Sequence, residues 1–281
     1  MDAIERGEGW TRSADGTALF WRSWRAPRPR AGVAIVHGLG EHSGRYDHVG
    51  QALAGRGYDC WAGDCRGHGL SPGPRVHVDD FGSYAEDAGA FLDLAAAPGR
   101  PLFLLGHSQG GLVALLRALR HPAGLEGVVV SSPFLAASPA AAPSAFRLAA
   151  ASVLLRIAPS FVTSTGLDTG ALSHDPAVEA RYVADPLVSR KVSAAWYRAA
   201  RAAQEEVNAG APRFPVPALV MASGDDRLVD PAAVRAWAER APAATTSYVE
   251  WPGLYHEMFN EIGREQVLSR VAEWLASAVE P

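Results

Sequence analysis

The sequence predicts an α/β fold in which a mostly parallel central sheet is flanked by helices and carries an inserted helical cap. Three observations support this prediction. From residue 33 onward, short apolar runs alternate with helical patterns, which is typical of βαβ units. The runs are apolar throughout, as expected for strands buried on both faces. The alternation stops near the middle of the chain for about 80 residues, which indicates an insertion.

The first predicted element is a β-hairpin over residues 9–24, because Ala14-Asp15-Gly16 is a turn sequence between segments rich in Trp, Thr and Phe. The strands expected after it are 33–36, 58–62, 102–105, 127–130, 218–221 and 246–250. The helices expected with them are 45–56, 84–96, 110–120, 231–240 and 261–279. Strands bounded in this way indicate a doubly wound sheet.

One domain is expected over residues 1–281, with a core of about 1–133 and 213–281 and a cap insertion of about 134–212. The cap should contain one helix over 145–157 and a second around 193–207. Apolar side chains gather on its first helix, which favours an acyl pocket and a contact with lipid surfaces, a buried cap core being the alternative. These side chains are Phe146, Leu148, Val153, Leu154, Leu155 and Ile157.

Composition excludes several functional classes. The net charge of -4 and the lack of a basic run argue against a nucleic-acid partner. The first 12 residues have no apolar core of a signal peptide, and no apolar run reaches the roughly 18 residues that span a bilayer. A cytoplasmic protein, at most peripheral at a membrane, is therefore expected. Cys60 and Cys65 match neither a zinc pattern nor a disulfide framework.

The strongest functional motif is Gly106-His107-Ser108-Gln109-Gly110, a G-x-S-x-G sequence between a predicted strand and a predicted helix. In this context the serine occupies a strained turn, and only small residues two positions before and after it leave room for that turn. The free N–H groups at the start of the helix suit an oxyanion. The motif therefore predicts Ser108 as a nucleophile.

A serine hydroxyl needs a histidine to accept its proton and an acid to orient that histidine. In folds with this motif the chain order is Ser, acid, His, which leaves His121, His174 and His256 as candidates. His121 ends the helix that follows the serine, and His174 falls in the predicted cap. His256 is favoured because it follows the last predicted strand, where the fold needs its base.

The acid should lie in the loop after strand 218–221, which contains Asp225, Asp226 and Asp230. Asp230 precedes Pro231 and a predicted helix, so an N-cap explains it better. Adjacent residues that leave a strand point in opposite directions, so only one of Asp225 and Asp226 can readily face the histidine. The residues alone leave these two open.

A second oxyanion donor should come from the loop after strand 33–36, which begins His37-Gly38-Leu39-Gly40 and can turn its backbone amides toward the site. The glycine spacing there is not G-x-G-x-x-G, and we find no ribose-binding acid to support a dinucleotide. No cofactor and no bound metal are therefore expected.

Three motifs point to one family: HGLGEHSGRY at 37–46, DCRGHGLS at 64–71 and GHSQG at 106–110. They closely resemble the monoacylglycerol lipase and lysophospholipase family of α/β-hydrolases, which are serine aminopeptidase S33-like enzymes. The resemblance spans the chain, is weakest in the cap, and implies the α/β-hydrolase fold. It also implies Asp226 as the acid, His256 as the base, and the backbone of Leu39 and Gln109 as the oxyanion hole, although Gly224 stands two residues before the acid rather than three.

The resulting expectation is a serine hydrolase that cleaves carboxylic esters through an acyl-enzyme, with monoacylglycerol as the substrate that the resemblance implies. Lysophospholipase and general carboxylesterase activities are the alternatives, ahead of a small-peptide hydrolase or a non-catalytic binding protein. The partner is a small-molecule or lipid ester, and oligomeric state is not predicted.

Four further residues are expected to form hydrogen bonds that hold the scaffold, with the arginines paired to carboxylates or loop carbonyls: His42, Arg45, Arg66 and His68.

Overall fold

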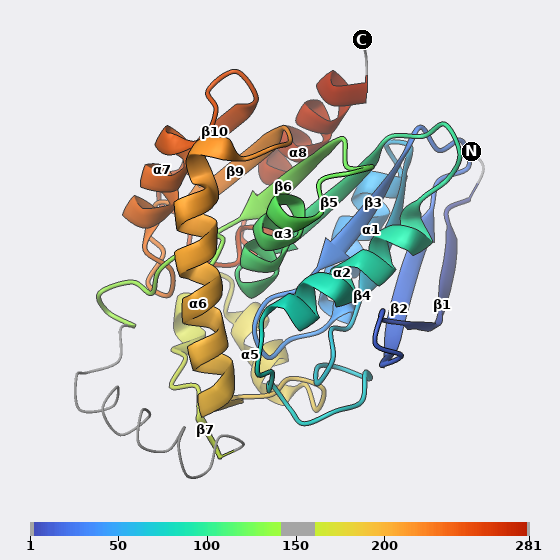
Figure 1. The fold of residues 1–281 in the computed structure, drawn as a ribbon. Coiled ribbons are helices and arrows are strands. Elements are labelled where there is room, and N and C mark those ends of the chain that lie inside the picture. The colour runs from blue at the N-terminus through green and yellow to red at the C-terminus, as the bar shows by residue number, and fades with distance from the viewer. Residues whose placement is uncertain (1–2, 142–160, 280–281) are drawn as a thin grey trace.

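An eight-stranded sheet forms the centre of the computed structural model, which describes residues 3–141 and 161–279 (Figure 1). The strands are β1 (Glu5–Arg12), β2 (Ala18–Arg25), β3 (Ala31–Val36), β4 (Tyr58–Gly63), β5 (Leu102–His107), β6 (Gly127–Ser131), β9 (Ala218–Ser223) and β10 (Thr246–Trp251). Their order across the sheet is β1-β2-β4-β3-β5-β6-β9-β10. The six strands from β4 to β10 in this order are parallel, which confirms the mostly parallel sheet.

The two antiparallel strands are the predicted hairpin. β1 pairs with β2, and β2 pairs with β4, both in the antiparallel sense. The turn between β1 and β2 closes with a hydrogen bond from Ser13 N to Thr17 O, and its Gly16 has a φ of +87°. A positive φ favours glycine, so the turn sequence explains where the hairpin reverses.

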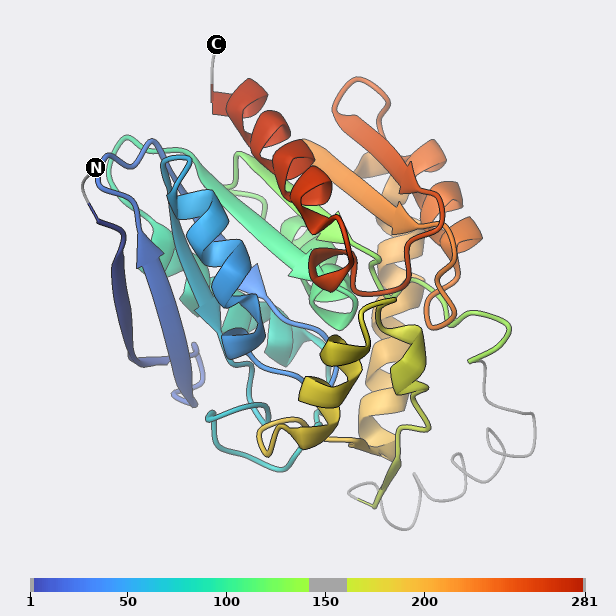
Figure 2. The same ribbon diagram turned by 180° about the vertical axis from the view of Figure 1, so that it is seen from behind.

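Helices cover both faces of the sheet (Figures 1 and 2). The helices outside the segment between β6 and β9 are η1 (Ser43–Tyr46), α1 (Asp47–Ala54), α2 (Gly82–Ala95), α3 (Gln109–Arg120), α7 (Pro231–Arg240), η4 (Met258–Asn260) and α8 (Arg264–Val279). α2, α3 and α7 pack on one face, and α1 and α8 pack on the other. This arrangement makes two hydrophobic cores, one on each side of the sheet.

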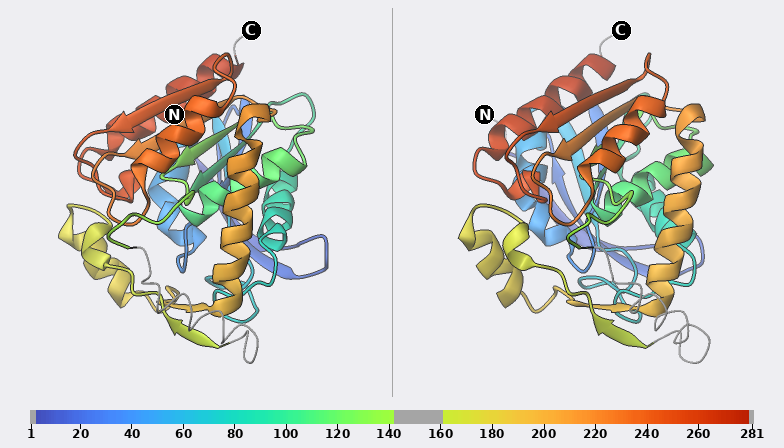
Figure 3. Two further views of the ribbon diagram at one scale, coloured as in Figure 1. Left: turned by 60° about the vertical axis from the view of Figure 1, so that its left-hand side comes forward. Right: turned by 90° about the vertical axis from the view of Figure 1, so that its left-hand side faces the viewer.

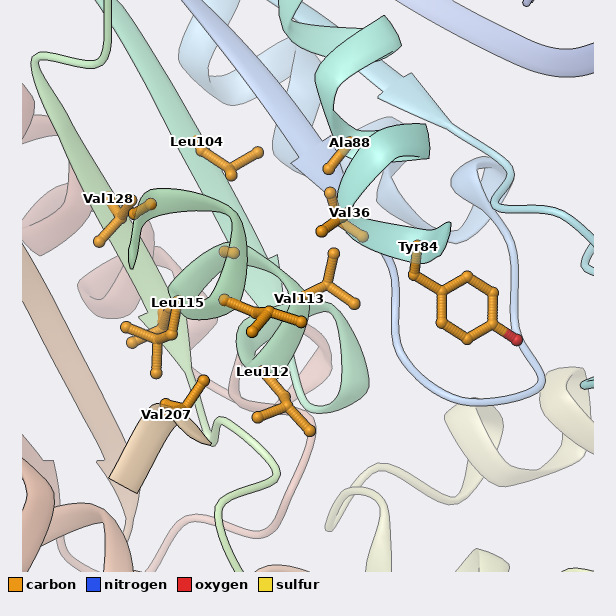
Figure 4. Close-up of a cluster of buried hydrophobic side chains, with 14 of the residues drawn as sticks. Val36, Tyr84, Ala88, Leu104, Leu112, Val113, Leu115, Val128 and Val207 are labelled. Atoms are coloured by element: carbon orange, nitrogen blue, oxygen red, sulfur yellow. The ribbon is translucent and has the colours of Figure 1, made fainter. Parts of the chain in front are cut away.

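Helix α3 is the most deeply enclosed of the layer on its face. Figure 4 shows Leu112, Val113 and Leu115 between strand residues such as Leu104 and the neighbouring layer that carries Val207. Burying one such side chain contributes roughly 1.5–3 kcal/mol relative to exposure. The start of α3, where Ser108 lies, is therefore held by a helix with little freedom to move.

In the segment between β6 and β9, residues 161–193 lie beside the carboxyl ends of the parallel strands, and residues 194–210 run back over the face that carries α3 (Figures 1 and 3). Its described elements are β7 (Val162–Ser164), η2 (Thr169–Ala171), α5 (Pro176–Ala184), β8 (Lys191–Ser193), α6 (Ala194–Gly210) and η3 (Ala211–Arg213). The helix predicted around 193–207 is confirmed as α6. The helix predicted over 145–157, with its six apolar residues, lies outside the described residues.

Several boundaries differ from the sequence-based expectation. The helix expected over 45–56 is a 3₁₀ turn followed by α1, which ends at Ala54. The last helix begins at Arg264 instead of 261, because Gly263 has a φ of +83°, which is incompatible with a right-handed helix. Helix α5 was not expected, although Asp175 caps it through Ala177 N and Pro176 opens it.

Candidate active site

Ser108 occupies the turn between β5 and α3 in a conformation that few L-residues adopt. Its φ is 53° and its ψ is -116°. Three hydrogen bonds fix this backbone: Ser108 N donates to Ser131 O at 2.9 Å, and Ser108 O accepts from Leu112 N at 3.1 Å and Phe134 N at 2.9 Å. Strain of this kind persists only when the surroundings hold it, and it is common at functional sites.

The glycines on both sides of Ser108 are required by close backbone approach. A methyl group on Gly106 would lie 2.1 Å from Gly110 O, and one on Gly110 would lie 2.1 Å from Val36 O. Both distances are far below van der Waals contact with backbone atoms, which cannot easily yield. The G-x-S-x-G sequence is therefore dictated by the packing of the turn against β3 and α3.

His256 and Asp226 form a buried pair from neighbouring loops. Asp226 follows β9, His256 follows β10, and His256 Nδ1 lies 2.7 Å from Asp226 Oδ2. Both side chains are at most 5% exposed. The second carboxylate oxygen of Asp226 accepts from Leu228 N at 2.8 Å and Val229 N at 2.9 Å, which fixes the carboxylate in place.

The other aspartates of this loop have different surroundings. Asp225 is exposed, and its backbone N–H donates to Leu254 O. Asp230 caps α7 by accepting from Ala232 N at 3.0 Å, as the sequence predicts. Only Asp226 of the three contacts His256.

The pair is arranged to stabilise an imidazolium. Burial alone would lower the pKa of His256, but the Asp226 carboxylate outweighs it and the pKa is raised above its ordinary 6.5. Burial alone would raise the pKa of Asp226, but the charge and hydrogen bond of His256 lower it. Asp226 therefore stays ionised and favours the protonated form of His256.

His107 connects this pair to Ser108. The His107 and His256 ring centroids are 4.8 Å apart, and His107 directly precedes Ser108 in the chain. Burial and the neighbouring His256 lower the pKa of His107 to about 3, so His107 stays neutral. Within residues 3–141 and 161–279, no hydrogen bond to the Ser108 hydroxyl is found; such contacts are often long before a substrate binds.

Two backbone N–H groups near Ser108 have no acceptor among the described residues. Gln109 is the first residue of α3, so its N–H has no partner within the helix. Leu39 lies in the turn after β3, and its N–H donates no hydrogen bond to any described residue. A methyl group on the neighbouring Gly38 would lie 3.4 Å from Ser108 Cβ, which places this turn against the serine. The backbone N–H groups of Leu39 and Gln109 can therefore donate hydrogen bonds to an oxyanion.

The side chain of Gln109 is anchored by a residue that the sequence did not suggest. Trp196, on α6, donates from Nε1 to Gln109 Oε1 at 2.8 Å. The Trp196 ring also stacks on Phe134, with 6.1 Å between centroids. The partners are 87 residues apart in the chain, and no local pattern in the sequence announces such a contact.

The expected scaffold roles are supported by the contacts of each residue. Arg45 pairs with Glu41 and Glu257, and Arg66 pairs with Asp87, so both arginines have carboxylate partners, as predicted. His42 Nε2 lies 2.9 Å from Asp185 Oδ2, and His68 Nδ1 lies 3.0 Å from Arg66 O. Glu41 and Glu257 were not predicted; the i,i+4 spacing of Glu41 and Arg45 was the available signal.

The two alternative histidines have other partners. His121 ends α3, 3.4 Å from Glu86, and His174 pairs with Glu261 at 2.8 Å. In the described part of the chain, no cluster of three or more His, Cys, Asp or Glu side chains is arranged to hold a metal ion.

Comparisons with known proteins agree on one kind of protein. A family model described as "Serine aminopeptidase, S33" matches residues 27–263. The chain is 36% identical over 281 residues to a monoacylglycerol lipase of Mycolicibacterium smegmatis, covering 99% of each chain. It is 37% identical over 248 residues to a phospholipase of Bacillus subtilis, covering 87% of this chain and 95% of that one.

A comparison with solved structures also gives a match over nearly the whole length of the chain. The crystal structure of a monoacylglycerol lipase from Paleococcus ferrophilus superposes with a TM-score of 0.83 at 33% identity, covering 99% of this chain and 100% of that one.

Proposed function

Since this chain belongs to the serine aminopeptidase S33 family, we propose that it is a serine hydrolase that cleaves the ester of a monoacylglycerol through an acyl-enzyme. The fold is the α/β-hydrolase fold, and the relatives named above are monoacylglycerol lipases and a phospholipase. The observation that supports the proposal most is the strained Ser108 turn, which lies beside the Asp226–His256 pair and beside two backbone N–H groups that have no acceptor in the described ranges.

In the acylation step, Ser108 Oγ attacks the ester carbonyl while His256 Nε2 accepts the hydroxyl proton. The oxyanion that forms accepts hydrogen bonds from the N–H groups of Leu39 and Gln109, a type of donor whose loss can cost about 10²–10³ in kcat. When the tetrahedral intermediate collapses, the protonated His256 gives its proton to the departing alcohol oxygen. Asp226 stabilises the imidazolium throughout.

Deacylation repeats the chemistry with water. Water attacks the acyl-enzyme carbonyl, His256 accepts one of its protons, and the same two N–H groups hold the second oxyanion. The Ser108–acyl bond then breaks, His256 returns the proton to Ser108 Oγ, and the fatty acid leaves. The two steps together consume one ester and one water and regenerate the enzyme.

A lipid acyl chain is supported by apolar side chains beside Ser108. Leu39 and Phe134 are partly buried and pack against the hydrophobic core, and Phe134 N donates to Ser108 O. They give a lipid chain an apolar surface at the reacting carbonyl. We propose that the cap, residues 134–212, completes this acyl pocket.

The second candidate substrate class is the lysophospholipids, which share the glyceryl ester and add a charged phosphodiester. It is favoured by the 37% identity to the Bacillus subtilis phospholipase. General carboxylesterase activity is the wider alternative.

One substrate panel separates these functions. Glyceryl monoesters of 8, 12, 16 and 18 carbons, the matching lysophosphatidylcholines, p-nitrophenyl esters and an aminoacyl-p-nitroanilide would be compared by kcat/KM. We expect the highest kcat/KM for a glyceryl monoester. Higher kcat/KM for the lysophosphatidylcholines would show that lysophospholipids, and not monoacylglycerols, are the preferred substrates. Turnover of the anilide alone would contradict ester hydrolysis.

We also propose a peripheral contact between the cap and lipid surfaces. None of the helices in the described ranges combines the length and apolar character that crossing a bilayer requires. Phe161 and Val162, at the start of the second described range, are 54% and 42% exposed. Exposed apolar side chains at adjoining positions suit insertion into an interface. The cytoplasmic location expected from the sequence stays a prediction.

A further inference from the structure

A buried cluster of charged side chains lies between the loop after β3 and the loop after β10. Arg45 Nη1 is 2.5 Å from Glu41 Oε2 and 2.7 Å from Glu257 Oε1, and Arg45 Nη2 is 2.7 Å from Glu257 Oε2. The side chains are 11% exposed for Arg45 and 4% for each glutamate. One guanidinium therefore pairs with two carboxylates in a largely buried site.

Glu41 belongs to the loop that carries the proposed oxyanion donor Leu39. Its Oε1 accepts from Gly38 N at 2.6 Å and from the Tyr46 hydroxyl at 2.8 Å. Gly38 directly precedes Leu39, so the position of the Glu41 carboxylate sets the path of the backbone at the oxyanion donor. Burial alone would raise the pKa of Glu41, but the charge of Arg45, the two neighbouring histidines and the hydrogen bond from Tyr46 together lower it to about 2.

Glu257 belongs to the loop that carries His256. It directly follows His256, its carboxylate receives both Arg45 donors described above, and Asn260 Nδ2 donates to its Oε2 at 2.8 Å. Its backbone N–H donates to Leu172 O at 2.8 Å. The carboxylate and the backbone N–H of Glu257 are both held, so a shift of this residue as a whole moves the backbone next to the His256 imidazole.

A third element contacts the same arginine. The Arg45 guanidinium carbon lies 4.9 Å from the centroid of the Tyr182 ring, on α5. Close by, Ser189 N donates to Gly40 O at 2.7 Å. The loop after β3, the loop after β10 and the segment after β6 thus meet at Arg45.

We propose that Arg45 is a positioning residue, which holds the loop that carries Leu39 and the loop that carries His256 at the spacing that ester hydrolysis requires. The inference rests on the proposed function. A planar guanidinium presents donors on two edges, so it can join two carboxylates that a lysine could not hold with the same geometry. Without the arginine, two buried carboxylates would lose their counter-ion and separate or take up protons. A displacement near 1 Å can cost about 10² in rate.

Arg66 provides a matched control. Its side chain is 15% exposed, pairs with the buried Asp87 through Nη2 at 2.7 Å, and also forms an ion pair with Asp15. It has the same chemistry as Arg45 and a similar burial, but its partners lie in the hairpin turn and on α2 instead of the loops that carry Leu39 and His256. Substitution of either arginine should lower the general stability of the protein. Only substitution of Arg45 should disturb the catalytic geometry.

The test compares R45Q, R45K, E257Q, R66Q and R66K by kcat and KM on a glyceryl monoester, with thermal unfolding of each. We expect kcat to fall about 10²-fold in R45Q with KM changed less than about threefold, because the arginine acts on geometry rather than on substrate binding. R45K should recover part of the loss, and E257Q should fall between R45K and wild type. R66Q and R66K should keep kcat within about threefold.

Affinity for a trifluoromethyl ketone, which mimics the tetrahedral oxyanion, supplies a readout that general destabilisation would not move. It should weaken in R45Q and E257Q in parallel with kcat, and stay unchanged in the Arg66 variants. If R45Q does not fold, R45K and E257Q carry the test. Equal kcat in the Arg45 and Arg66 variants, with wild type active, would overturn the positioning role. An inactive wild type would instead overturn the proposed function.

Discussion

At the scale of single residues, the site combines one strained residue with one strongly fixed pair. A non-glycine residue at φ 53° costs on the order of 1–3 kcal/mol, and the three backbone hydrogen bonds of Ser108 offset that strain. The Asp226 carboxylate has both oxygens engaged, one by His256 and one by two backbone N–H groups. Such a pair is oriented before substrate arrives, so little reorganisation is needed during the reaction.

Replacing Asp226 with Asn should nearly abolish ester hydrolysis, while replacing Asp225 with Asn should not. An amide at position 226 would favour the wrong tautomer of His256, which can cost on the order of 10⁴ in kcat. Asp225 is exposed and its side chain does not contact the histidine. Steady-state kcat of the two purified variants tests this assignment. Equal activity, or the reverse order, would be incompatible with it.

The pH dependence of kcat/KM should show an acidic limb above pH 6.5. His256 must be neutral to accept the serine proton, and its pKa is raised above 6.5 because the Asp226 carboxylate outweighs the effect of burial. Activity is therefore lost as the pH falls through that raised pKa. Removing the carboxylate in D226N favours neutral imidazole, so the limb of the residual activity should move to lower pH. D225N should leave the limb in place, and a shift in D225N instead would contradict the pairing.

The residues of the candidate site could be proposed from the sequence to different degrees. Ser108 and His256 follow from a motif and from chain order. Asp225 and Asp226 could not be separated by the residues alone, because the choice depends on which carboxylate turns inward after β9. Glu257 was not identified, because its partner Arg45 is 212 residues away in the chain. Ion pairs between distant loops leave no local pattern.

At the scale of elements, the strand-turn-helix unit around Ser108 is set by its glycines. Gly106→Ala would place a methyl group 2.1 Å from Gly110 O, where backbone must move. We expect a loss of about 1–3 kcal/mol or more in the free energy of unfolding. Urea denaturation measures it. Gly55→Ala is the control, because its methyl group would meet nothing closer than 3.4 Å at a φ of -61°, and it should be nearly neutral.

Elements with strong end signals were predicted with accurate bounds, and weak ones were missed. Helix α7 begins at Pro231 and ends at Arg240 as expected, since Asp230 and Pro231 mark its start. α5 has the same Asp-Pro start, but only Val178 and Tyr182 of its nine residues are buried, so its apolar pattern is too short to show a helical period. Strands β7 and β8 have three residues each and owe their pairing to tertiary contact rather than to propensity.

At the scale of the whole molecule, sequence predicted the sheet and not the way the segment after β6 docks on it. Strands buried on both faces give continuous apolar runs that are visible in any α/β sequence. Side chains such as Trp196 and Gln109 make some of the docking contacts, and others are hydrogen bonds between backbone groups, such as Glu257 N to Leu172 O and Ser189 N to Gly40 O. Backbone contacts carry no side-chain signature, so the sequence cannot announce them.

The proposed membrane contact predicts that exposed Phe161 contributes to vesicle binding and that exposed Trp10 does not. Phe161→Asp should reduce co-sedimentation with phosphatidylcholine–phosphatidylglycerol vesicles, because it places a charge where an apolar ring would insert. Trp10→Asp is the control: Trp10 is 58% exposed on β1, away from the cap, and should have no effect on co-sedimentation. Both variants should keep kcat on a short-chain soluble ester. Equal sedimentation of both variants and wild type would exclude a contact through Phe161.

The most direct test of the central claim is covalent labelling with a fluorophosphonate followed by mass spectrometry of the digested protein. Only a serine activated by a histidine reacts rapidly with this electrophile. The account predicts one adduct, on Ser108, with much slower labelling in H256A and none in S108A, and loss of ester hydrolysis in the same order. An adduct on a different serine, or an S108A variant that keeps most of its esterase activity while folded, would contradict the account.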